Sequence, residues 1–390
     1  MNIPQEYQEG YERARLRHPE RAARYVRNTL IGDPAADAVI EALAKVGAAQ
    51  RQDLLTRGIE GGADAIPDAP PVVREFFADL EVVPAWFDPE FSLVGSRAFY
   101  RHSNMFLAAF VGAVLIEGFS TLISKSFGIT GMIVDQGERR LKQNNRHVAE
   151  IFLPGGLARQ GDGWKLSVRI RMIHAQARYL LGKSTDWDAA AWGLPLSAAH
   201  QAYGAATFSG LLLKHTRKLG VQLSKEERQS FMMIWRYSAH LMGIVPDMLF
   251  ETEDDAIALY ELGMAIEPPP SVESCHMAHA LINGAPIVAG LESVEERRKL
   301  ARRIYRISRA LIGDARADQL RYPPAITFGA LPLLRFTNRA DELLQRYVPA
   351  LARKRRMGQF QMMIDMSNYE KEGIRYRVPE NVHAEKDAPL

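Results

Sequence analysis

Apolar residues recur at intervals of three and four along this chain, which is the period of an α-helix. Phe231, Ile234 and Trp235 show this period. They follow Ser224-Lys-Glu-Glu227, the pattern of a capping box, in which a serine and a glutamate satisfy each other's backbone N–H groups at a helix start. Alternating apolar and polar residues, the signal of a half-buried strand, never run for more than a few positions. The sequence therefore predicts an all-α fold.

Caps and prolines divide the chain into helices. Asp33 and Pro34 form a helix start, and prolines at 70–71, 268–270 and 323–324 mark breaks. We expect the main helices at 35–48, 94–117, 119–127, 135–153, 164–182, 198–220, 225–241, 254–266, 271–289 and 294–312, with a last one reaching about 366. Neither an internal repeat nor a long linker separates two cores. The sequence predicts an N-terminal arm at 1–30, one helical domain at 31–366 and a polar tail at 367–390.

Composition narrows the class of protein. Of the 390 residues, 47% are hydrophobic and 24% charged, as in a folded globular chain, and the formal net charge is only +3. The single cysteine, Cys275, excludes an intrachain disulfide framework. The N-terminus is charged from residue 5 onward and has no apolar signal core. We therefore expect a cytoplasmic protein, in contact with a membrane at most at its surface, with no nucleic-acid partner.

The segment 105–116 is apolar enough to suggest a membrane, but Glu117 and Lys125 interrupt its continuation. The uninterrupted part is shorter than the roughly 20 residues that a spanning helix needs. A buried core helix is the better interpretation. The small residues at positions 108, 109, 112 and 113 would let a helix or a flat cofactor approach closely.

The stretch from Trp164 to Gly182 carries the clearest functional signal. At helical spacing it places Arg171, His174 and Arg178 on one stripe of an otherwise apolar helix. Haem would account for all three, because imidazole can ligate iron and guanidinium groups can bind the two propionates. The ordinary alternative is a hydrogen-bonded core histidine flanked by arginines in ion pairs. The stripe alone leaves both interpretations open.

Other polar clusters each have an ordinary structural explanation. Arg140 and Lys142 belong to a basic run that would also suit a solvated helix face, and Thr207 lies among small residues that would also suit helix packing. His240, one turn after Arg236, would also suit a satisfied core histidine. The basic runs at 296–303 and 353–356 suit solvated faces. Cys275, His276 and His279 lack a fourth metal ligand nearby.

Several enzyme classes have no motif support. Phosphate-binding glycine loops, His-Glu-x-x-His, Glu-x-x-His pairs and Gly-x-Ser-x-Gly are all missing from the sequence. The motifs that are present resemble a known family, the haem-b oxygenases that include the rubber oxygenases and a fungal enzyme that cleaves a prenyl side chain. The resemblance covers about 32–264. Its markers, in order, are GDPAADAVIEAL, Leu-x-x-x-Pro-x-Trp-Phe-Asp from Leu80, Arg-Arg-Leu at 139–141, the Arg171–His174–Arg178 stripe and WRYSAHLMGI.

The resemblance implies a globin-like, haem-enclosing helical core with extra N- and C-terminal helices, and it implies haem b as cofactor. His174 resembles the proximal iron ligand, and Arg171 and Arg178 its flanking arginines. His240 would be a further cofactor-binding residue. Arg140 resembles the arginine of the distal side.

The distal side also departs from the rubber oxygenase pattern. Three and four residues after the distal arginine, that pattern has lysine and threonine, whereas this chain has Gln143 and Asn144. The remaining candidate catalytic residues are Lys142, Glu117 as a distal acid and Thr207 as a pocket threonine.

The implied reaction is oxidative cleavage of a C=C bond by O2 in a hydrophobic, isoprenoid-like small molecule. Two alternatives remain open: a non-catalytic haem sensor or carrier, and a haem-free helical module that meets membranes. The sequence leaves the oligomeric state open.

Overall fold

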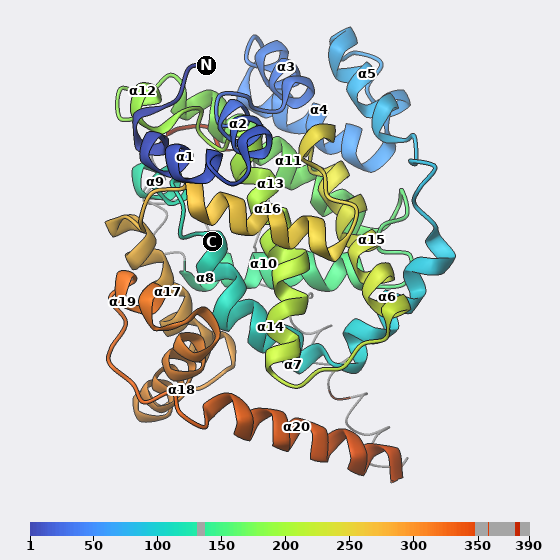
Figure 1. Ribbon diagram of the computed structural model, residues 1–390. Helices are drawn as coiled ribbons and strands as arrows, with labels where there is room; N and C mark the ends of the chain where they lie inside the picture. The colour runs from blue at the N-terminus through green and yellow to red at the C-terminus, as the bar shows by residue number, and fades with distance from the viewer. Residues whose placement is uncertain (131–136, 348–357, 359–378, 383–390) are drawn as a thin grey trace.

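A computed structural model of the protein describes residues 1–130, 137–347, 358 and 379–382, and gives the backbone alone for 137–140 and 341–346. Every regular element in these ranges is helical, so the predicted all-α fold is confirmed (Figure 1). The first half of the chain contributes α1 (Gln8–Arg15), α2 (Pro19–Asn28), α3 (Pro34–Leu43), α4 (Ala48–Gly61), α5 (Pro71–Leu80), α6 (Pro89–Arg101), α7 (Ser103–Ala109), α8 (Leu115–Gly118), α9 (Ile123–Ile129), α10 (Gly137–Phe152) and α11 (Asp162–Leu181).

The second half contributes α12 (Ala189–Trp192), α13 (Ala198–Ala206), α14 (Leu212–Lys218), α15 (Lys225–Leu241), α16 (Glu253–Ile266), α17 (Val272–Val288), α18 (Val294–Ile312), α19 (Asp314–Gln319) and α20 (Ala330–Tyr347). Short 3₁₀ turns lie at Gln5–Tyr7, Ala63–Ala65 and Pro246–Met248. In Figure 1, α18 and α20 form the base of the molecule, and α1 to α5 lie at the opposite end.

Helix starts follow the predicted capping chemistry. Asp33 accepts a hydrogen bond from the backbone N–H of Ala36, and Ser224 and Glu227 form the predicted capping box. A second capping box, at Thr252 and Asp255, was not predicted. These caps satisfy backbone N–H groups that a helix start otherwise leaves unpaired.

The predicted helix at 94–117 is wrong in one respect, because it is divided. His102 has φ −120° and ψ 22°, which ends α6 and starts α7. The axis changes direction by 80° at this break. Apolar periodicity continues through the break, since α6 packs along α15 and α7 packs against α14, and each needs a buried face.

The middle of the molecule is an aromatic core. The rings of Phe99 and Phe152 stack with centroids 4.3 Å apart, Phe152 and Phe231 with centroids 4.8 Å apart, and Phe231 and Phe106 with centroids 5.2 Å apart. These four side chains come from α6, α10, α15 and α7, so the stack joins helices that are distant in the sequence.

Two helical runs contain a π-helical turn. Phe110–Val114 connects α7 to α8, and Thr207–Leu211 connects α13 to α14. The two turns contact each other in the interior. Such turns cost hydrogen-bond geometry and are found frequently at functional sites.

The segment 105–116 lies in this interior, and most of its residues are buried, as predicted for a core helix. No single helix among the described residues is long and apolar enough to cross a membrane. By length and composition alone, the bent pair of Pro89–Arg101 and Ser103–Gly118 would be.

The N-terminal 30 residues pack onto the body. Tyr7 and Tyr25 are fully buried, and Tyr11 is half-buried. α1 packs against α16, and α2 against α13 and α16. Of the predicted tail at 367–390, only 379–382 lie within the described residues.

Candidate functional site

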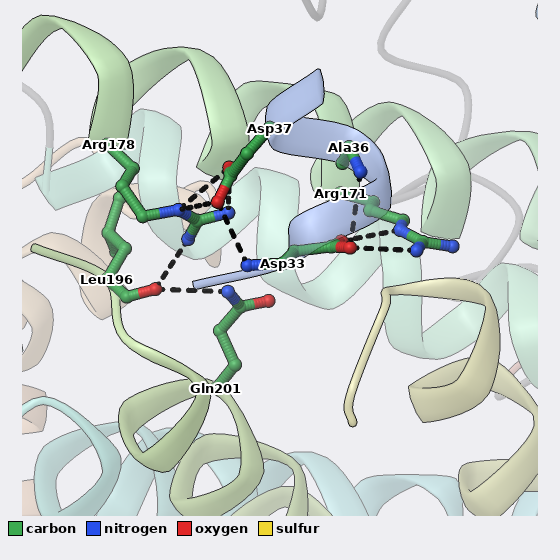
Figure 2. Close-up of polar contacts among 7 residues, drawn as sticks. All are labelled: Asp33, Ala36, Asp37, Arg171, Arg178, Leu196 and Gln201. Atoms are coloured by element: carbon green, nitrogen blue, oxygen red, sulfur yellow. Dashed lines mark hydrogen bonds and ion pairs between the residues drawn. The ribbon is translucent and has the colours of Figure 1, made fainter. Parts of the chain in front are cut away.

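α11 holds the predicted Arg171, His174 and Arg178, and its two arginines are paired with α3 (Figure 2). Arg171 donates to both carboxylate oxygens of Asp33, over 2.6 and 2.9 Å. Arg178 donates from Nε and Nη2 to Asp37, over 2.7 to 3.1 Å, and from Nη1 to the carbonyl oxygen of Leu196. Both pairs are forked and largely shielded from water, which is the geometry that makes arginine–carboxylate pairs strong.

The resemblance implies that both arginines flank the haem, whereas here both pair with carboxylates of the chain itself. All three nitrogens of the Arg178 guanidinium are engaged by the chain itself, and its side chain is 4% exposed. Arg171 also packs its guanidinium 4.9 Å from the ring centre of Phe76. The ordinary alternative, arginines in ion pairs, therefore describes both residues, whose effect is to fix α11 against α3.

On both sides of His174, contacts lead from α11 towards the α13 run, which consists of α13 and the π-helical turn at Thr207–Leu211. At one end, Arg178 and Gln201 donate to the same carbonyl oxygen, that of Leu196. At the other end, contacts lead from Ser167 on α11 through His147 and Trp235 to Phe208. Gln201 and Phe208 flank Gly204 on the α13 run.

The space at the Cβ position of Gly204 is open. A Cβ atom at Gly204 would meet no described atom within 4 Å, although its neighbours Tyr203 and Ala205 are buried. His174, Gly204 and Phe208 are all half-buried, while the residues that tie the helices on either side are buried. We treat His174, Gly204 and Phe208 together as the candidate site, which we call the His174 hollow.

Aromatic side chains close one side of the His174 hollow. The ring of Phe208 lies 5.2 Å from that of Phe110 and 6.4 Å from that of Phe119. Phe119 in turn packs edge-on against Phe127 of α9. The surroundings are thus mainly apolar, which suits a planar or greasy ligand.

His147 is a buried histidine that the sequence analysis did not single out. Its Nε2 lies 3.0 Å from Ser167 Oγ and 3.3 Å from Ser238 Oγ. Burial, together with the nearby charge of His174, lowers the pKa of His147 to about 3. His147 is therefore neutral at ordinary pH, and its hydrogen bonds join α10 to α11 and α15.

Glu117, predicted as a distal acid, is buried in a hydrogen-bonded cluster. Its carboxylate lies 2.7 Å from His215 Nε2 and accepts a hydrogen bond of 2.7 Å from the Tyr260 hydroxyl. Burial alone would raise the pKa of Glu117, but the hydrogen bonds and charge of His215, with the hydrogen bond of Tyr260, outweigh it and hold the pKa below its usual value. Both carboxylate oxygens are thus occupied by α14 and α16.

Two further predicted residues, Thr207 and His240, also have structural partners. The hydroxyl of Thr207 donates to the backbone carbonyl of Tyr203 over 2.7 Å, and Thr207 is fully buried. His240 stacks on Tyr237 and meets Trp86 edge-on. Burial, and the charges of Arg171 and Arg236, lower the pKa of His240.

The predicted distal residues lie on α10. Arg140 is in this helix, but its side chain lies outside the described residues. Lys142, Gln143 and Asn144 are half-buried, one turn or so before His147, and α10 packs directly on α11. The structure therefore brings the α10 segment alongside α11.

Sequence reasoning missed the partners more than the central residues. Asp33 and Asp37 were available as two carboxylates four apart on one helix face, a spacing that matches two arginines on a crossing helix. His215 stands in the basic run LLLKHTRK and gave no signal for burial. Among the described residues, Cys275, His276 and His279 form no metal cluster, because His276 is exposed and His279 bonds to Tyr305.

Fold and site together describe a helical protein in which α11 carries a half-buried histidine and the candidate site has small and apolar residues. Residues 97–345 match the family model described as the catalytic domain of "ER-bound oxygenase mpaB/B'/Rubber oxygenase". The chain belongs to this oxygenase family.

Two relatives give the degree of similarity. The chain is 23% identical over 241 residues to the rubber oxygenase of Streptomyces sp. (strain K30), covering 58% of this chain and 57% of that protein. It therefore spans little more than half the length of that relative. It also resembles the solved structure of the latex clearing protein LCP in the closed state, with a TM-score of 0.64, 19% identity, and coverage of 87% of this chain and 91% of that one. The latter similarity concerns the fold.

Proposed function

We propose that this protein is a haem b-dependent oxygenase acting on a hydrophobic, alkene-containing small molecule, with His174 as the axial ligand of the iron. The observations that carry the proposal are the half-buried His174 on α11 and the open Cβ position of Gly204 among the small residues of α13. Haem bound there would supply a site that binds and activates O2, and O2 would be the oxidant whose two atoms become the carbonyl oxygens when a C=C bond is cleaved. The family membership supports oxygenase chemistry.

The residues around the hollow fit a flat, apolar group. Ala202, Gly204 and Ala205 have small or no side chains, so that part of α13 offers little obstruction to a flat ring. Phe208 and Phe119 would exclude water and contact a greasy substrate. The Arg171–Asp33 and Arg178–Asp37 pairs hold α11 on both sides of His174, and thereby fix the position of its imidazole.

The distal side is assigned to α10. Arg140 would line it, and Gln143 and Asn144 would offer amide groups where rubber oxygenases have a lysine and a threonine. Amides can donate hydrogen bonds to a bound oxygen species but do not act as strong acids. The assignment therefore predicts a distal side with no lysine ligand and no strong acid.

The first experiment is the absorption spectrum of the purified, haem-loaded protein, before and after reduction with dithionite under carbon monoxide. We expect a Soret band that shifts on adding carbon monoxide, and loss or displacement of that band in His174→Ala. The matched control is His276→Ala, which removes an exposed histidine and should leave the band unchanged. We expect His240→Ala to leave it unchanged as well.

Two results would contradict the proposal. A protein that stays featureless after haem addition would remove the cofactor, and an unmoved Soret band in His174→Ala would remove the ligand assignment. With haem in place, O2 uptake and carbonyl products from short terpenoid alkenes test the reaction. Haem binding without O2 uptake would leave a haem-binding protein and no oxygenase.

A further inference from the structure

α20 is a surface helix with an unusual outer face. Its inner side packs on the body through Leu331, Leu334 and Asn338, the last of which donates to the carbonyl oxygen of Leu219 over 2.7 Å. A helix in this position normally turns polar residues outward. Here the outer side presents Leu333, 65% exposed, and Phe336, 71% exposed, three residues apart on one face.

The segment leading into α20 adds two more exposed apolar side chains. Ile326 is 81% exposed and Phe328 is 91% exposed. The backbone at Phe328 is fixed to α18, because its carbonyl oxygen accepts a hydrogen bond from Arg306 over 3.3 Å. We call Ile326, Phe328, Leu333 and Phe336 the apolar base.

Basic residues lie on both α18 and α20, the two helices at this end of the molecule. Residues 321–340 contain three arginines and neither aspartate nor glutamate. On α18, the turns that precede Arg306 expose further basic residues, namely Arg298, Lys299, Arg302 and Arg303. None of these four, nor Arg306, forms an ion pair with a described carboxylate, unlike Arg309, which faces Asp314 and Asp318. In Figure 1, α18 and α20 lie together at one end of the molecule.

Exposed aromatic and aliphatic side chains beside uncompensated arginines match an anionic lipid surface. The apolar side chains enter the boundary between headgroups and acyl chains, and each basic side chain near the surface adds attraction to the anionic headgroups. A protein partner would also suit apolar side chains, but the surplus of cations with no acids between 321 and 340 favours a uniformly negative surface. We propose that the protein docks on anionic membranes through the apolar base and the basic face of α18.

The test is flotation of the full-length protein with vesicles of phosphatidylcholine alone and with 30 mol% phosphatidylglycerol, a composition of about one anionic lipid in three. We expect binding to the anionic vesicles only, weakened by raising the salt concentration. F328S/F336S should lower the partition coefficient at least about tenfold, since each buried aromatic side chain contributes more than 1 kcal/mol. R302Q/R303Q should lower it about fivefold per arginine on anionic vesicles.

The matched control is V82S/V83S, which removes two exposed apolar side chains from the loop between α5 and α6 and should leave binding unchanged. Equal binding to neutral vesicles, or no binding to either, would overturn the proposal. So would a dimer in light scattering that F328S/F336S dissociates, because a second copy would then cover the base. A lower free energy of unfolding in F328S/F336S without vesicle binding would show that the chain covers the base itself. None of these measurements depends on haem or turnover.

Discussion

At the scale of single residues, Glu117 is a charged carboxylate placed where water does not reach. Its side chain is 6% exposed, and His215 and Tyr260 bind its two oxygens. A buried pair of this kind gives little net stability over an apolar substitute, but losing one partner leaves the other buried without compensation. Glu117 therefore acts as a structural anchor between α8, α14 and α16.

We predict that Glu117→Gln lowers the free energy of unfolding by about 3 kcal/mol at neutral pH, because it removes the charge from a buried pair. The folded-state pKa of Glu117 is below its unfolded value of 4.5, so its contribution is fully present above that value. The contribution is lost as the pH falls through the folded-state pKa. Denaturant unfolding of the wild-type and Glu117→Gln proteins at pH values between about 3 and 8 measures the difference in the free energy of unfolding.

Glu261→Gln is the control for this prediction. Glu261 pairs with Lys214 over 3.1 Å, and both side chains are exposed, so the expected loss is below about 1 kcal/mol. A loss for Glu117→Gln no larger than this, or one that grows as the pH falls, would show that Glu117 is not held as a charged group.

At the scale of elements, the α13 run is rich in residues with small side chains or none. Gly204 sits within a helix, where glycine costs about 1 kcal/mol relative to alanine. A packing reason for this glycine is absent among the described residues, since its Cβ position is open. Gly95 on α6 is the opposite case, because a Cβ there would lie 2.7 Å from the backbone nitrogen of Phe231.

We predict that Gly204→Ala raises the free energy of unfolding by up to about 1 kcal/mol, whereas Gly95→Ala lowers it. Gly204→Phe should keep the fold but fill the His174 hollow, so that the Soret absorbance per protein falls several-fold. Thermal unfolding and haem titration measure the two effects. Full haem binding by Gly204→Phe would separate Gly204 from the cofactor site.

At the scale of the whole molecule, one buried cluster joins four distant parts of the chain. Glu267, between α16 and α17, accepts hydrogen bonds from the Tyr25 hydroxyl over 2.9 Å and from the backbone N–H of Leu122 over 3.2 Å. His200 Nε2 lies 3.3 Å from the same carboxylate and 3.0 Å from the Tyr7 hydroxyl. Burial, followed by the charge of Glu267, raises the pKa of both tyrosines. The first 30 residues are thus part of the core.

We predict that the N-terminal helices unfold together with the body. Amide hydrogens of α2 should exchange with a free energy of opening close to that of α16, because both helices flank this cluster. Tyr25→Phe should weaken both to the same degree. Rapid exchange in α2 beside slow exchange in α16 would indicate an independent arm.

The sequence by itself determined the helical class and the position of most helices. Period, caps and prolines are local signals, so Asp33, Ser224 and the triple proline at 268–270 could be interpreted without knowing any partner. The sequence also predicted that α11 and His174 form the core of the cofactor site, and this stays a prediction. The order of motifs pointed to the oxygenase family.

Only the tertiary structure decided which partner each polar side chain has. The spacing of Arg171 and Arg178 was compatible with propionates or with aspartates, and the packing of α3 beside α11 selected Asp33 and Asp37. Likewise, Glu117 meets His215 and Tyr260 across 98 and 143 residues of chain. A side chain's partner depends on which helices lie side by side, and the periodicity of one helix carries no information about its neighbours.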